Sequence, residues 1–367
     1  MQKKIRIDLI AGARPNFVKL APVIHALDAA IIGGWSCEYR LIHTGQHYDH
    51  ALSQSFFDQL QIPIPKINLG VGSGSQAEQT AKILVAYEAV LLSNRADLTL
   101  VFGDVTSTLA CSLAAAKLNI PIAHVEGGIR SGDREMPEEI NRIVTDALSS
   151  FFFTTTKEAG SNLLAEGKNQ NQIFWVGNTM IDSLIKNSPR FFAPSIFGEL
   201  SLAPKKYLVM TLHRPSNVDN PKILSSILKT VADSCLDFPV VFPTHPRVRK
   251  MLNEMQYQSD FVKLIDPLSY LEFNYLVMHS GGVITDSGGI TEETTVLNIP
   301  CLTLRNSTER PETCTIGTNV LVGDDLMAMG GYITRMVNGQ WHSGGIPELW
   351  DGRTSERIVN HLQKILN

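Results

Sequence analysis

Residues 98–126 read LTLVFGDVTSTLACSLAAAKLNIPIAHVE, and this stretch predicts the fold of the chain. It begins with a short apolar run, Leu98–Phe102, continues into a helical pattern over Ser107–Leu118, and returns to a second apolar run, Ile122–Val125. Runs that are apolar at every position, rather than at alternate positions, are typical of strands covered on both faces. The stretch is therefore predicted to form a strand, a crossover helix and a second, parallel strand.

The same alternation of strand and helix extends towards both ends of the chain. Further strands are predicted over Ile5–Ala11, Tyr39–His43, Phe151–Thr154, Tyr207–Leu212, Val240–Phe242, Val262–Leu264, Gly282–Thr285 and Cys301–Leu304. Helical patterns lie between them, for example over Phe17–Ala29, Gln76–Leu92 and Pro221–Asp233. This alternation predicts an α/β fold in which helices cover both faces of parallel sheets.

Residues 187–206 interrupt the alternation. They contain Pro189, Pro194, Pro204 and Gly198 and show little periodicity, which is typical of a crossing between domains. Two domains are also expected from the length of 367 residues.

The predicted division of the chain follows from that crossing. The first domain is predicted over residues 1–186 and the second over residues 207–352. The last residues, 353–367, have an amphipathic helical pattern, and this helix could pack back on the first domain.

Composition and charge exclude several functional classes. The formal net charge of −4 is unlike that of a typical nucleic-acid-binding protein. The five cysteines include no CxxC pair, which favours reduced core cysteines in the cytoplasm. The start lacks a signal-peptide pattern, and no segment approaches the ~18 uninterrupted apolar residues of a membrane helix. We therefore expect a cytoplasmic protein with neither a nucleic-acid nor a membrane partner.

The stretch GARPNFVK, residues 12–19, directly follows the first predicted strand. A loop at the carboxyl end of a parallel strand that leads into a helix is where such sheets bind ligands. Arg14 and Lys19 could supply positive charge to a diphosphate, together with the helix N-terminus. The alternative is an ordinary strand-to-helix turn with a solvated arginine.

A second stretch, DSGGITEE, follows the predicted strand Gly282–Thr285. Ser287–Gly289 could present backbone N–H groups to a phosphate at the start of a helix. One of the two glutamates that follow, Glu292 and Glu293, could bind a ribose diol. The alternative is a helix start whose acidic residues complement the helix dipole, and Glu292 suits that role better than Glu293.

Carboxylates gather after strands in the first half of the chain. Asp104 and Glu126 follow consecutive predicted strands, and Glu138 lies in the segment REMPEEINR. Carboxylates in one crevice can act as general acid and base. Helix capping is the alternative for Asp104, and complementation of the helix dipole is the alternative for Glu138 and Glu139. Glu126 has the weakest structural alternative, because a glutamate between a strand and Gly-Gly gains little stability.

Three histidines also follow predicted strands. His213, followed by Arg214, could bind a pyrophosphate or assist its departure. His47 and His245 occupy similar positions, and each of them alone is more often structural.

Taken together, these motifs resemble those of the non-hydrolysing UDP-N-acetylglucosamine 2-epimerases, and the resemblance covers nearly the whole chain. Single motifs such as GD are unspecific, but the ordered set is highly specific. In chain order the motifs are GxRP near the start, QH after the second strand, GDxTST, HVExGxR, PEExNR, GNTxID at residues 177–182, HR at residues 213–214, TDSGGxxEE, and RxxTERPE at residues 305–312.

The resemblance implies a GT-B fold, in which two Rossmann-like domains hold UDP in the cleft between them. It also implies reversible conversion of UDP-N-acetylglucosamine to UDP-N-acetylmannosamine, through elimination of UDP to a 2-acetamidoglucal and its re-addition. The family uses no metal, nicotinamide or other cofactor and forms homodimers. Coupling removal of the proton at carbon 2 to departure of UDP avoids a free carbanion, and this chemistry needs acid–base groups and cations on the diphosphate.

The resemblance also implies roles for individual residues. The residues that match the family's catalytic positions are Asp104, Glu126, Glu138 and His213. Those that match its nucleotide contacts are Arg14, Lys19, Ser287, Gly288, Gly289 and Glu293, and Arg310 lies in its TERPE element. Further substrate contacts are predicted for His47, Arg130 and Arg214, which lie in the shared motifs, and for His245, which follows a predicted strand.

The sequence departs from the family pattern at three places. Asn16 stands where many members have glutamate, and HRPSN at residues 213–217 lacks a second basic residue. His47 is followed by Tyr48, whereas members activated by their substrate usually have QHR, so that activation does not carry over.

Several other functions stay open. The GARP opening also occurs in relatives that act on UDP-2,3-diacetamido-glucuronic acid. A hydrolysing epimerase, a GT-B glycosyltransferase and a non-enzymatic nucleotide-sugar binder are the remaining alternatives. The number of carboxylates argues against the transferase.

Overall fold

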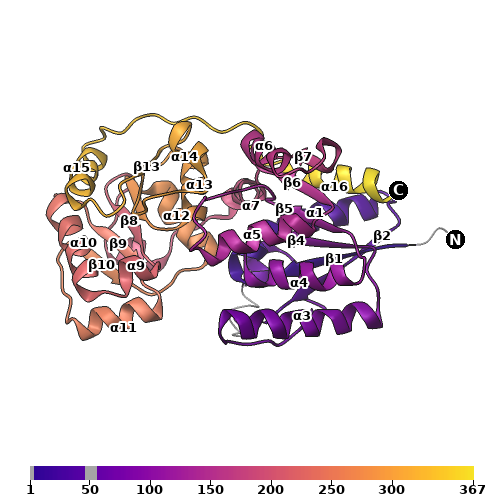
Figure 1. Cartoon of the computed structure of the whole chain (residues 1–367). Helices are drawn as coiled ribbons and strands as arrows, with labels where there is room; N and C mark the ends of the chain where they lie inside the picture. Colours follow the sequence, from indigo (N-terminus) through magenta and orange to yellow (C-terminus); the bar gives the residue numbers. More distant parts are fainter. Residues whose placement is uncertain (1–3, 46–55) are drawn as a thin grey trace. The chain divides into compact units, whose positions relative to one another are not determined.

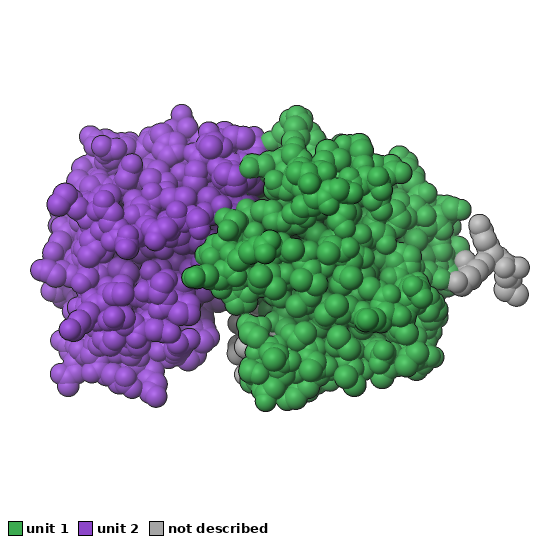
Figure 2. All heavy atoms as spheres, in the orientation of Figure 1, with its two compact units in different colours: residues 1–186, 348–367 green, residues 187–347 purple. Residues whose placement is uncertain are grey.

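The computed structural model describes residues 4–45 and 56–367, apart from the side chain of Arg14, and forms two compact units (Figures 1 and 2). Unit 1 comprises the chain up to Lys186 together with Glu348–Asn367, and unit 2 comprises Asn187–Pro347. Residues 187–206, where the sequence predicted a crossing, belong to unit 2, because apolar side chains of this stretch such as Phe197 pack on its core.

Unit 1 is built on a seven-stranded sheet with the order β3-β2-β1-β4-β5-β6-β7, and all its strand pairs are parallel. Its strands are β1 Ile5–Ala11, β2 Cys37–His43, β3 Ile67–Asn68, β4 Leu98–Phe102, β5 Ile122–Val125, β6 Phe151–Thr154 and β7 Ile173–Trp175. Its helices are α1 Arg14–Ile32, α3 Gln76–Ser93, α4 Thr106–Lys117, α5 Pro137–Leu148, α6 Lys157–Ala165, the short 3-10 helix Gln170–Gln172, α7 Thr179–Asn187 and α16 Thr354–Leu366.

Unit 2 repeats this architecture with six parallel strands in the order β10-β9-β8-β11-β12-β13. Its strands are β8 Leu208–Thr211, β9 Val240–Pro243, β10 Val262–Ile265, β11 Gly282–Thr285, β12 Cys301–Thr303 and β13 Asn319–Leu321. Its helices are the 3-10 helix Ser188–Arg190, α8 Ser195–Glu199, α9 Pro215–Val218, α10 Pro221–Ser234, α11 Pro246–Glu254, α12 Tyr270–His279, α13 Gly288–Leu297, α14 Pro311–Thr315 and α15 Leu326–Val337.

The α/β fold with parallel sheets is therefore confirmed. The strands that the sequence predicted as apolar throughout are buried throughout, as β4 and β5 show. The three strands that it missed, β3, β7 and β13, have only two or three residues each. Such short strands carry too few residues for a recognisable pattern.

The motif GNTMID at residues 177–182 holds the C-terminal segment within unit 1. A Cβ atom at Gly177 would lie 2.3 Å from the Leu349 carbonyl oxygen, so only glycine fits there. The buried carboxylate of Asp182 accepts hydrogen bonds from the backbone N–H groups of Thr354 and Ser355, at 3.0 and 2.7 Å. The carboxylate thereby satisfies the free N–H groups that open α16.

Among the described residues, one window, Pro15–Ile32 of α1, is long and apolar enough by composition to cross a membrane, although the sequence analysis expected no such segment. Half of this window is buried inside the protein. Core helices pass the same test, so this single helix is weak evidence for a membrane span.

Candidate active site

In each unit, candidate residues follow the two strands at which the strand order reverses. In unit 1, Lys19 and Asp104 follow the neighbouring strands β1 and β4, and in unit 2, His213 and Ser287 follow the neighbouring strands β8 and β11. Ligands of open α/β sheets bind outside the carboxyl ends of the strands at such a reversal. The topology therefore gives both units a candidate ligand site at the equivalent place.

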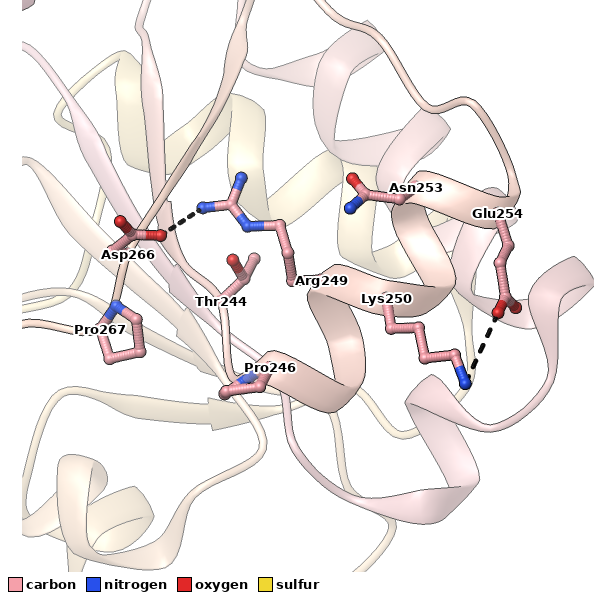
Figure 3. Close-up of a pocket in the computed structure, with 8 residues that line it drawn as sticks. All are labelled: Thr244, Pro246, Arg249, Lys250, Asn253, Glu254, Asp266 and Pro267. Atoms are coloured by element: carbon pink, nitrogen blue, oxygen red, sulfur yellow. Dashed lines mark hydrogen bonds and ion pairs between the residues drawn. The ribbon is translucent and has the colours of Figure 1, made fainter. Parts of the chain in front are cut away.

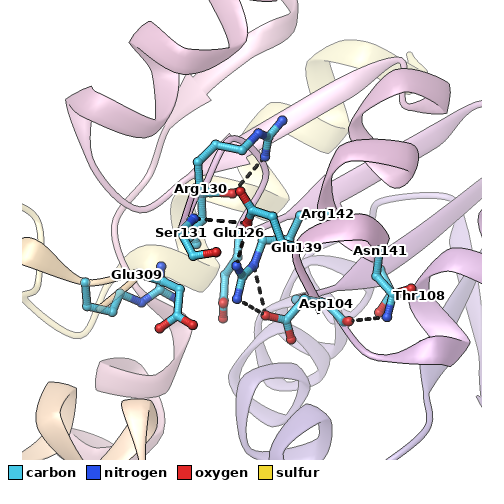
Figure 4. Close-up of polar contacts among 12 residues, drawn as sticks. Asp104, Thr108, Glu126, Arg130, Ser131, Glu139, Asn141, Arg142 and Glu309 are labelled. Atoms are coloured by element: carbon cyan, nitrogen blue, oxygen red, sulfur yellow. Dashed lines mark hydrogen bonds and ion pairs between the residues drawn. The ribbon is translucent and has the colours of Figure 1, made fainter. Parts of the chain in front are cut away.

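Asp104 follows β4 and is bound by an arginine of α5. Arg142 donates to one Asp104 carboxylate oxygen through Nε at 3.0 Å and Nη2 at 2.5 Å (Figure 4). The preceding residue of α5, Asn141, donates to the Asp104 carbonyl oxygen at 2.7 Å. The N-cap residue of α4 is Val105, and no side chain caps this helix. The capping role considered for Asp104 is therefore not observed. Its carboxylate is instead held in place at the end of the sheet.

The structure separates the two glutamates at the start of α5. Glu139 is buried and accepts hydrogen bonds from the backbone N–H groups of Ser131 and Gly132, both at 3.0 Å, and from Arg142 at 2.8 Å. Burial raises the pKa of Glu139, but these hydrogen bonds outweigh burial and lower it. Glu138 is exposed. Glu139 therefore fastens the preceding loop, while Glu138 is accessible to a ligand.

Glu126 follows β5 and pairs with Lys19. Its Oε2 atom lies 2.8 Å from Lys19 Nζ, and the glutamate side chain is only 3% exposed. Glu126 has a φ of 74°, a left-handed conformation that is uncommon in residues other than glycine. Backbone strain of this kind is concentrated at functional sites. Lys19, predicted to bind a diphosphate, has a carboxylate partner in this structure.

A buried histidine connects the loops that carry Asp104 and Glu126. His124 of β5 lies 2.6 Å from Asp146 through Nδ1 and 2.8 Å from the Gly103 carbonyl oxygen through Nε2. Each ring nitrogen thus lies within hydrogen-bonding distance of an oxygen atom. The sequence analysis did not identify His124 or Asp146 as site residues.

Asp146 also contacts the loop that follows β5. Its Oδ2 atom accepts from the Gly128 N–H at 3.0 Å and lies 2.8 Å from Arg130 Nη1. Burial raises the pKa of Asp146, but the charge of His124, its hydrogen bond and Arg130 outweigh burial and lower it. Arg130, predicted to contact substrate, also forms a bidentate ion pair with Glu166. Its Nε and Nη2 atoms lie 2.8 and 2.7 Å from the two carboxylate oxygens. In this structure Arg130 therefore supports the loop that follows β5.

Asn16, where many relatives have glutamate, joins the loop after β1 to β4. Its side-chain oxygen accepts from the N–H groups of Gly12 and Ala13, at 3.2 and 3.1 Å, and its amide donates to the Phe102 carbonyl oxygen at 3.1 Å. An ionised glutamate could accept the first two hydrogen bonds but could not donate the third.

In unit 2, a buried aspartate orients His213. Asp286 is fully buried, and its Oδ1 atom lies 2.7 Å from His213 Nδ1. It also accepts from the backbone N–H groups of His213 and Arg214, at 3.1 and 2.9 Å. Burial raises the pKa of Asp286, but His213 and the surrounding donors outweigh burial and lower it. The His213 ring is about half exposed, so its Nε2 atom is free to face a ligand.

The predicted phosphate cradle opens a helix. Ser287 precedes α13 without capping it through its side chain, and Gly288 is the first helical residue. The first turn contains no acidic residue, so the dipole role considered for Glu292 and Glu293 is not observed. Free backbone N–H groups and the positive end of the helix dipole lie at the start of α13, and helix starts of this kind bind anions.

The two glutamates of α13 have different partners. Glu292 forms a buried ion pair with Arg310, which was predicted to contact substrate. Glu293 accepts a hydrogen bond from the Tyr270 hydroxyl group at 3.1 Å. Burial, together with the neighbouring Glu292, raises the pKa of Glu293 to about 7. Glu292 is thus engaged by an arginine and Glu293 by a tyrosine hydroxyl group.

Three predicted contacts remain: His245 lies apart from the site residues of unit 2, and the side chains of His47 and Arg14 are not described. His245 is exposed and caps α11 by accepting the Arg247 N–H at 3.3 Å. It borders an open hollow of about 470 Å³, where Arg249 and Lys250 pair with Asp266 and Glu254 (Figure 3). The hollow therefore offers no unpaired lysine or arginine to an anion. His47 and the side chain of Arg14 lie outside the described residues.

No cluster of three or more His, Cys, Asp or Glu side chains that could hold a metal occurs within residues 4–45 and 56–367. The carboxylates of the site are instead paired with Arg142, Lys19, His213 and Arg310. The arrangement can move protons and bind a diphosphate with the chain's own groups.

Comparison with known proteins shows the family of the chain. A model of the UDP-N-acetylglucosamine 2-epimerase family matches residues 34–363. The UDP-N-acetylglucosamine 2-epimerase of Methanocaldococcus jannaschii is 40% identical over 98% of this chain and 99% of its own length. The chain belongs to the UDP-N-acetylglucosamine 2-epimerase family.

Other members of this epimerase family are similar over the same length. A UDP-2,3-diacetamido-2,3-dideoxy-D-glucuronate 2-epimerase of Pseudomonas aeruginosa is 38% identical over 98% of this chain and 100% of its own length. The crystal structure of the Methanocaldococcus jannaschii enzyme in complex with UDP-GlcNAc and UDP superposes with a TM-score of 0.87, at 39% identity and with 98% and 100% of the two chains covered. The protein is thus an epimerase-family enzyme with the GT-B fold.

Proposed function

We propose that this epimerase interconverts UDP-N-acetylglucosamine and UDP-N-acetylmannosamine by eliminating UDP and adding it back. In the first step, a base removes the proton at carbon 2, the carbon 1–oxygen bond to UDP breaks, and a 2-acetamidoglucal forms. In the second step, UDP attacks carbon 1 and an acid protonates carbon 2 on the opposite face. The two steps together change no oxidation state of the substrate, so the reaction needs no oxidant or reductant.

The observation that carries this proposal is the pair of carboxylates at the ends of adjacent strands. Asp104 follows β4 and Glu126 follows β5, and these strands pair in parallel register. Each carboxylate is held by a cation of its own unit, Arg142 or Lys19. Two positioned carboxylates are what proton transfer on two faces of a sugar requires. Glu138, exposed on α5, is the third candidate acid–base group in our proposal.

Lys19 gives this arrangement a way to respond to substrate. The diphosphate carries more negative charge than a single carboxylate and would attract Lys19 away from Glu126. A carboxylate that loses a cationic partner becomes a stronger base, because the partner had stabilised its charged form. Glu126 would therefore become basic when the diphosphate is bound.

In our proposal the residues of unit 2 hold the nucleotide. His213, fixed by Asp286, binds the diphosphate and assists the departure of UDP. The backbone N–H groups that open α13 bind a phosphate, and Glu293 accepts hydrogen bonds from the ribose. Support comes from the relative of Methanocaldococcus jannaschii, whose structure contains UDP-GlcNAc and UDP.

A second substrate deserves a test, because the relative named for UDP-2,3-diacetamido-2,3-dideoxy-D-glucuronate is almost as similar as the one named for UDP-N-acetylglucosamine. The test incubates the enzyme with each UDP-sugar alone and follows the products by proton NMR. We expect a UDP-sugar epimerised at carbon 2 from UDP-N-acetylglucosamine. Free sugar would indicate hydrolysis, and no reaction with UDP-N-acetylglucosamine would contradict the proposal.

A further inference from the structure

The first residue of α12 contacts a carboxylate of the neighbouring helix α13. The Tyr270 hydroxyl group donates a hydrogen bond to Glu293 Oε1 at 3.1 Å. The two helices lie side by side in unit 2 (Figure 1). Tyr270 belongs to none of the sequence motifs that indicated the family, so its contact with Glu293 is a feature that only the structure reveals.

The surroundings of Tyr270 fix its ring and keep its hydroxyl group a donor. Ser269 and Glu272 form a capping box, so α12 begins at a defined residue. The Phe191 ring packs edge-on against the Tyr270 ring, with the two centroids 6.4 Å apart. Burial, together with the charge of Glu293 and its hydrogen bond, raises the pKa of Tyr270 well above its usual range. The hydroxyl group therefore keeps its proton and donates it to the hydrogen bond with Glu293.

The contact leaves Glu293 with room for a ligand. An ionised carboxylate offers about four lone-pair positions to donors. Tyr270 uses one of them, and the side chain of Asn274 makes a further hydrogen bond to the carboxylate. About two positions then remain. This number matches the two neighbouring hydroxyl groups of a ribose.

We propose that Tyr270 is a positioning residue for the nucleotide, whose hydroxyl group holds the Glu293 carboxylate ready to accept both hydroxyl groups of the ribose. This inference rests on the proposed role of Glu293 in binding the ribose of the UDP-sugar. Tyr270 acts through Glu293 and not by touching the substrate. Its contribution should therefore appear in nucleotide affinity, and only under conditions in which the carboxylate needs its help.

Those conditions follow from the charges around Glu293. Burial raises its pKa to about 7, the hydrogen bond from Tyr270 opposes this rise, and Glu292 on the same helix adds to it. Glu292 is itself paired with Arg310, which precedes α14. The other ionisable side chains on the elements packed against α13 affect this pKa less, and they are Glu272, Tyr275 and His279 of α12, Cys301 of β12, and Glu312 and Cys314 of α14. At neutral pH, Tyr270 is thus the main side chain that favours the ionised form of Glu293.

The test compares UDP binding by wild type and Tyr270→Phe, measured by calorimetry at pH 7 and pH 9. The substitution keeps the ring and removes only the hydroxyl group, so Glu293 should hold its proton to higher pH. At pH 7 we expect the variant to bind UDP about 10-fold more weakly than wild type, because hydrogen bonds to charged groups are strong. At pH 9 both proteins ionise Glu293, and the two dissociation constants should agree within about twofold.

Two controls separate this effect from a general loss of packing. Tyr275→Phe alters another tyrosine of α12, whose ring stacks on His279, and should bind UDP as wild type does at both pH values. The analogue 2′,3′-dideoxy-UDP lacks both ribose hydroxyl groups, so wild type and Tyr270→Phe should bind it equally at pH 7. Three results would each overturn the inference: unchanged UDP affinity of Tyr270→Phe at pH 7, equal weakening at pH 7 and pH 9, or the same weakening with the dideoxy analogue.

Glu293→Gln distinguishes this inference from the proposed function on which it rests. Weak UDP binding by Glu293→Gln, together with wild-type behaviour of Tyr270→Phe, would refute the inference alone. Wild-type UDP affinity of Glu293→Gln would refute the proposed role of Glu293 and the inference with it. Because no turnover is measured, these outcomes are independent of the proposed proton transfer at carbon 2.

Discussion

Glu126 combines burial with a left-handed backbone conformation. The residue is 4% exposed, has a φ of 74° and contacts Lys19 at 2.8 Å. Such a conformation costs on the order of 1–3 kcal/mol unless the residue is glycine. Glycine at this position would relieve the strain but would carry no carboxylate. The strain is therefore consistent with a need for an acid–base group at this point of the loop.

Replacing this carboxylate should affect turnover more than nucleotide binding. Glu126→Gln keeps the shape of the side chain but cannot exchange a proton at carbon 2, so kcat should fall at least ~10²-fold. Affinity for UDP, measured by calorimetry, should stay close to wild type. The matched control is Glu135→Gln, an exposed glutamate of the loop before α5, which should leave kcat unchanged. Near-normal turnover in Glu126→Gln would remove Glu126 from the proposed catalytic groups.

The pairing of Asp286 with His213 should be visible in kinetics. Asp286→Asn retains one acceptor oxygen where the structure uses two, and it removes the negative charge beside the ring. We expect kcat to fall about 10²-fold, since the histidine loses its fixed orientation and charge partner. In a His213→Ala background the same substitution should add little, because the two groups act together. Full additivity of the two losses would show that Asp286 acts independently of His213.

Glu293 should make stability depend on pH in a defined direction. Burial raises its folded pKa from 4.5 to about 7, so between these values the folded state holds a proton that the unfolded state has released. The contribution of Glu293 to stability is therefore greatest below pH 4.5 and declines as pH rises towards 7, by on the order of 3 kcal/mol.

Urea denaturation at pH 5 and pH 8 measures this decline. Glu293→Gln cannot ionise, so the variant should lose less stability than wild type between the two pH values. Glu254→Gln, at an exposed glutamate of the same unit, should match wild type. A Glu293→Gln variant with the same pH dependence as wild type would refute the raised pKa.

At the scale of elements, His124 joins two strand ends and a helix. Its ring connects β5 to the Gly103 carbonyl oxygen, directly before Asp104, and to Asp146 on α5. Asp146 also binds the Gly128 N–H, in the loop after Glu126. The loops that carry Asp104 and Glu126 are thus connected by one buried polar network. Networks of this kind stabilise a single arrangement when every member is satisfied.

Removing the imidazole should loosen both loops. His124→Leu deprives Asp146 of a partner in the interior, so the free energy of unfolding should fall by about 3 kcal/mol, and kcat should fall with it. His361→Leu, at a partly exposed histidine whose ring contacts that of Phe174, should have the smaller effect on stability and leave kcat unchanged. A stable and fully active His124→Leu variant would show that the network does not position the site.

The elements could largely be predicted from the sequence, whereas their polar partners could not. The strands β1, β4, β5, β6 and β11 have the predicted bounds, because each is a mainly apolar run between loop residues. The missed strands β3, β7 and β13 are too short to show a pattern.

Ion pairs between residues far apart in the chain could not be predicted from the sequence. The pairing of Arg142 with Asp104 spans 38 residues, and that of Asp286 with His213 spans 73. No local spacing indicates which charged residues meet across a sheet. Glu138 and Glu139 are chemically identical neighbours, and only the direction of each side chain on α5 distinguishes the exposed residue from the buried one. Arg142 and Asp286 do lie within the motifs PEExNR and TDSGGxxEE, but the sequence analysis gave neither of them a role.

At the scale of the whole molecule, the two units share one plan. In each sheet the strand order reverses at the strand that comes first in the chain, β1 or β8. Two strands lie on one side of it, and on the other side lie four strands in unit 1 and three in unit 2. The sequence hinted at this through GARPN and HRPSN, and each of these turns follows the first strand of its sheet. The shared plan places the proposed acid–base residues after strands of unit 1 and the proposed anion-binding groups after strands of unit 2. This division of labour matches a reaction in which a nucleotide leaves and returns while a sugar carbon is inverted.

The most direct test of the account is the fate of the hydrogen at carbon 2. The enzyme is incubated with UDP-N-acetylglucosamine in heavy water, and the product is analysed by proton NMR and mass spectrometry. Proton transfer by the site carboxylates predicts UDP-N-acetylmannosamine that carries deuterium at carbon 2, because these groups exchange with solvent. Epimerised product that keeps its original hydrogen at carbon 2 would contradict the account.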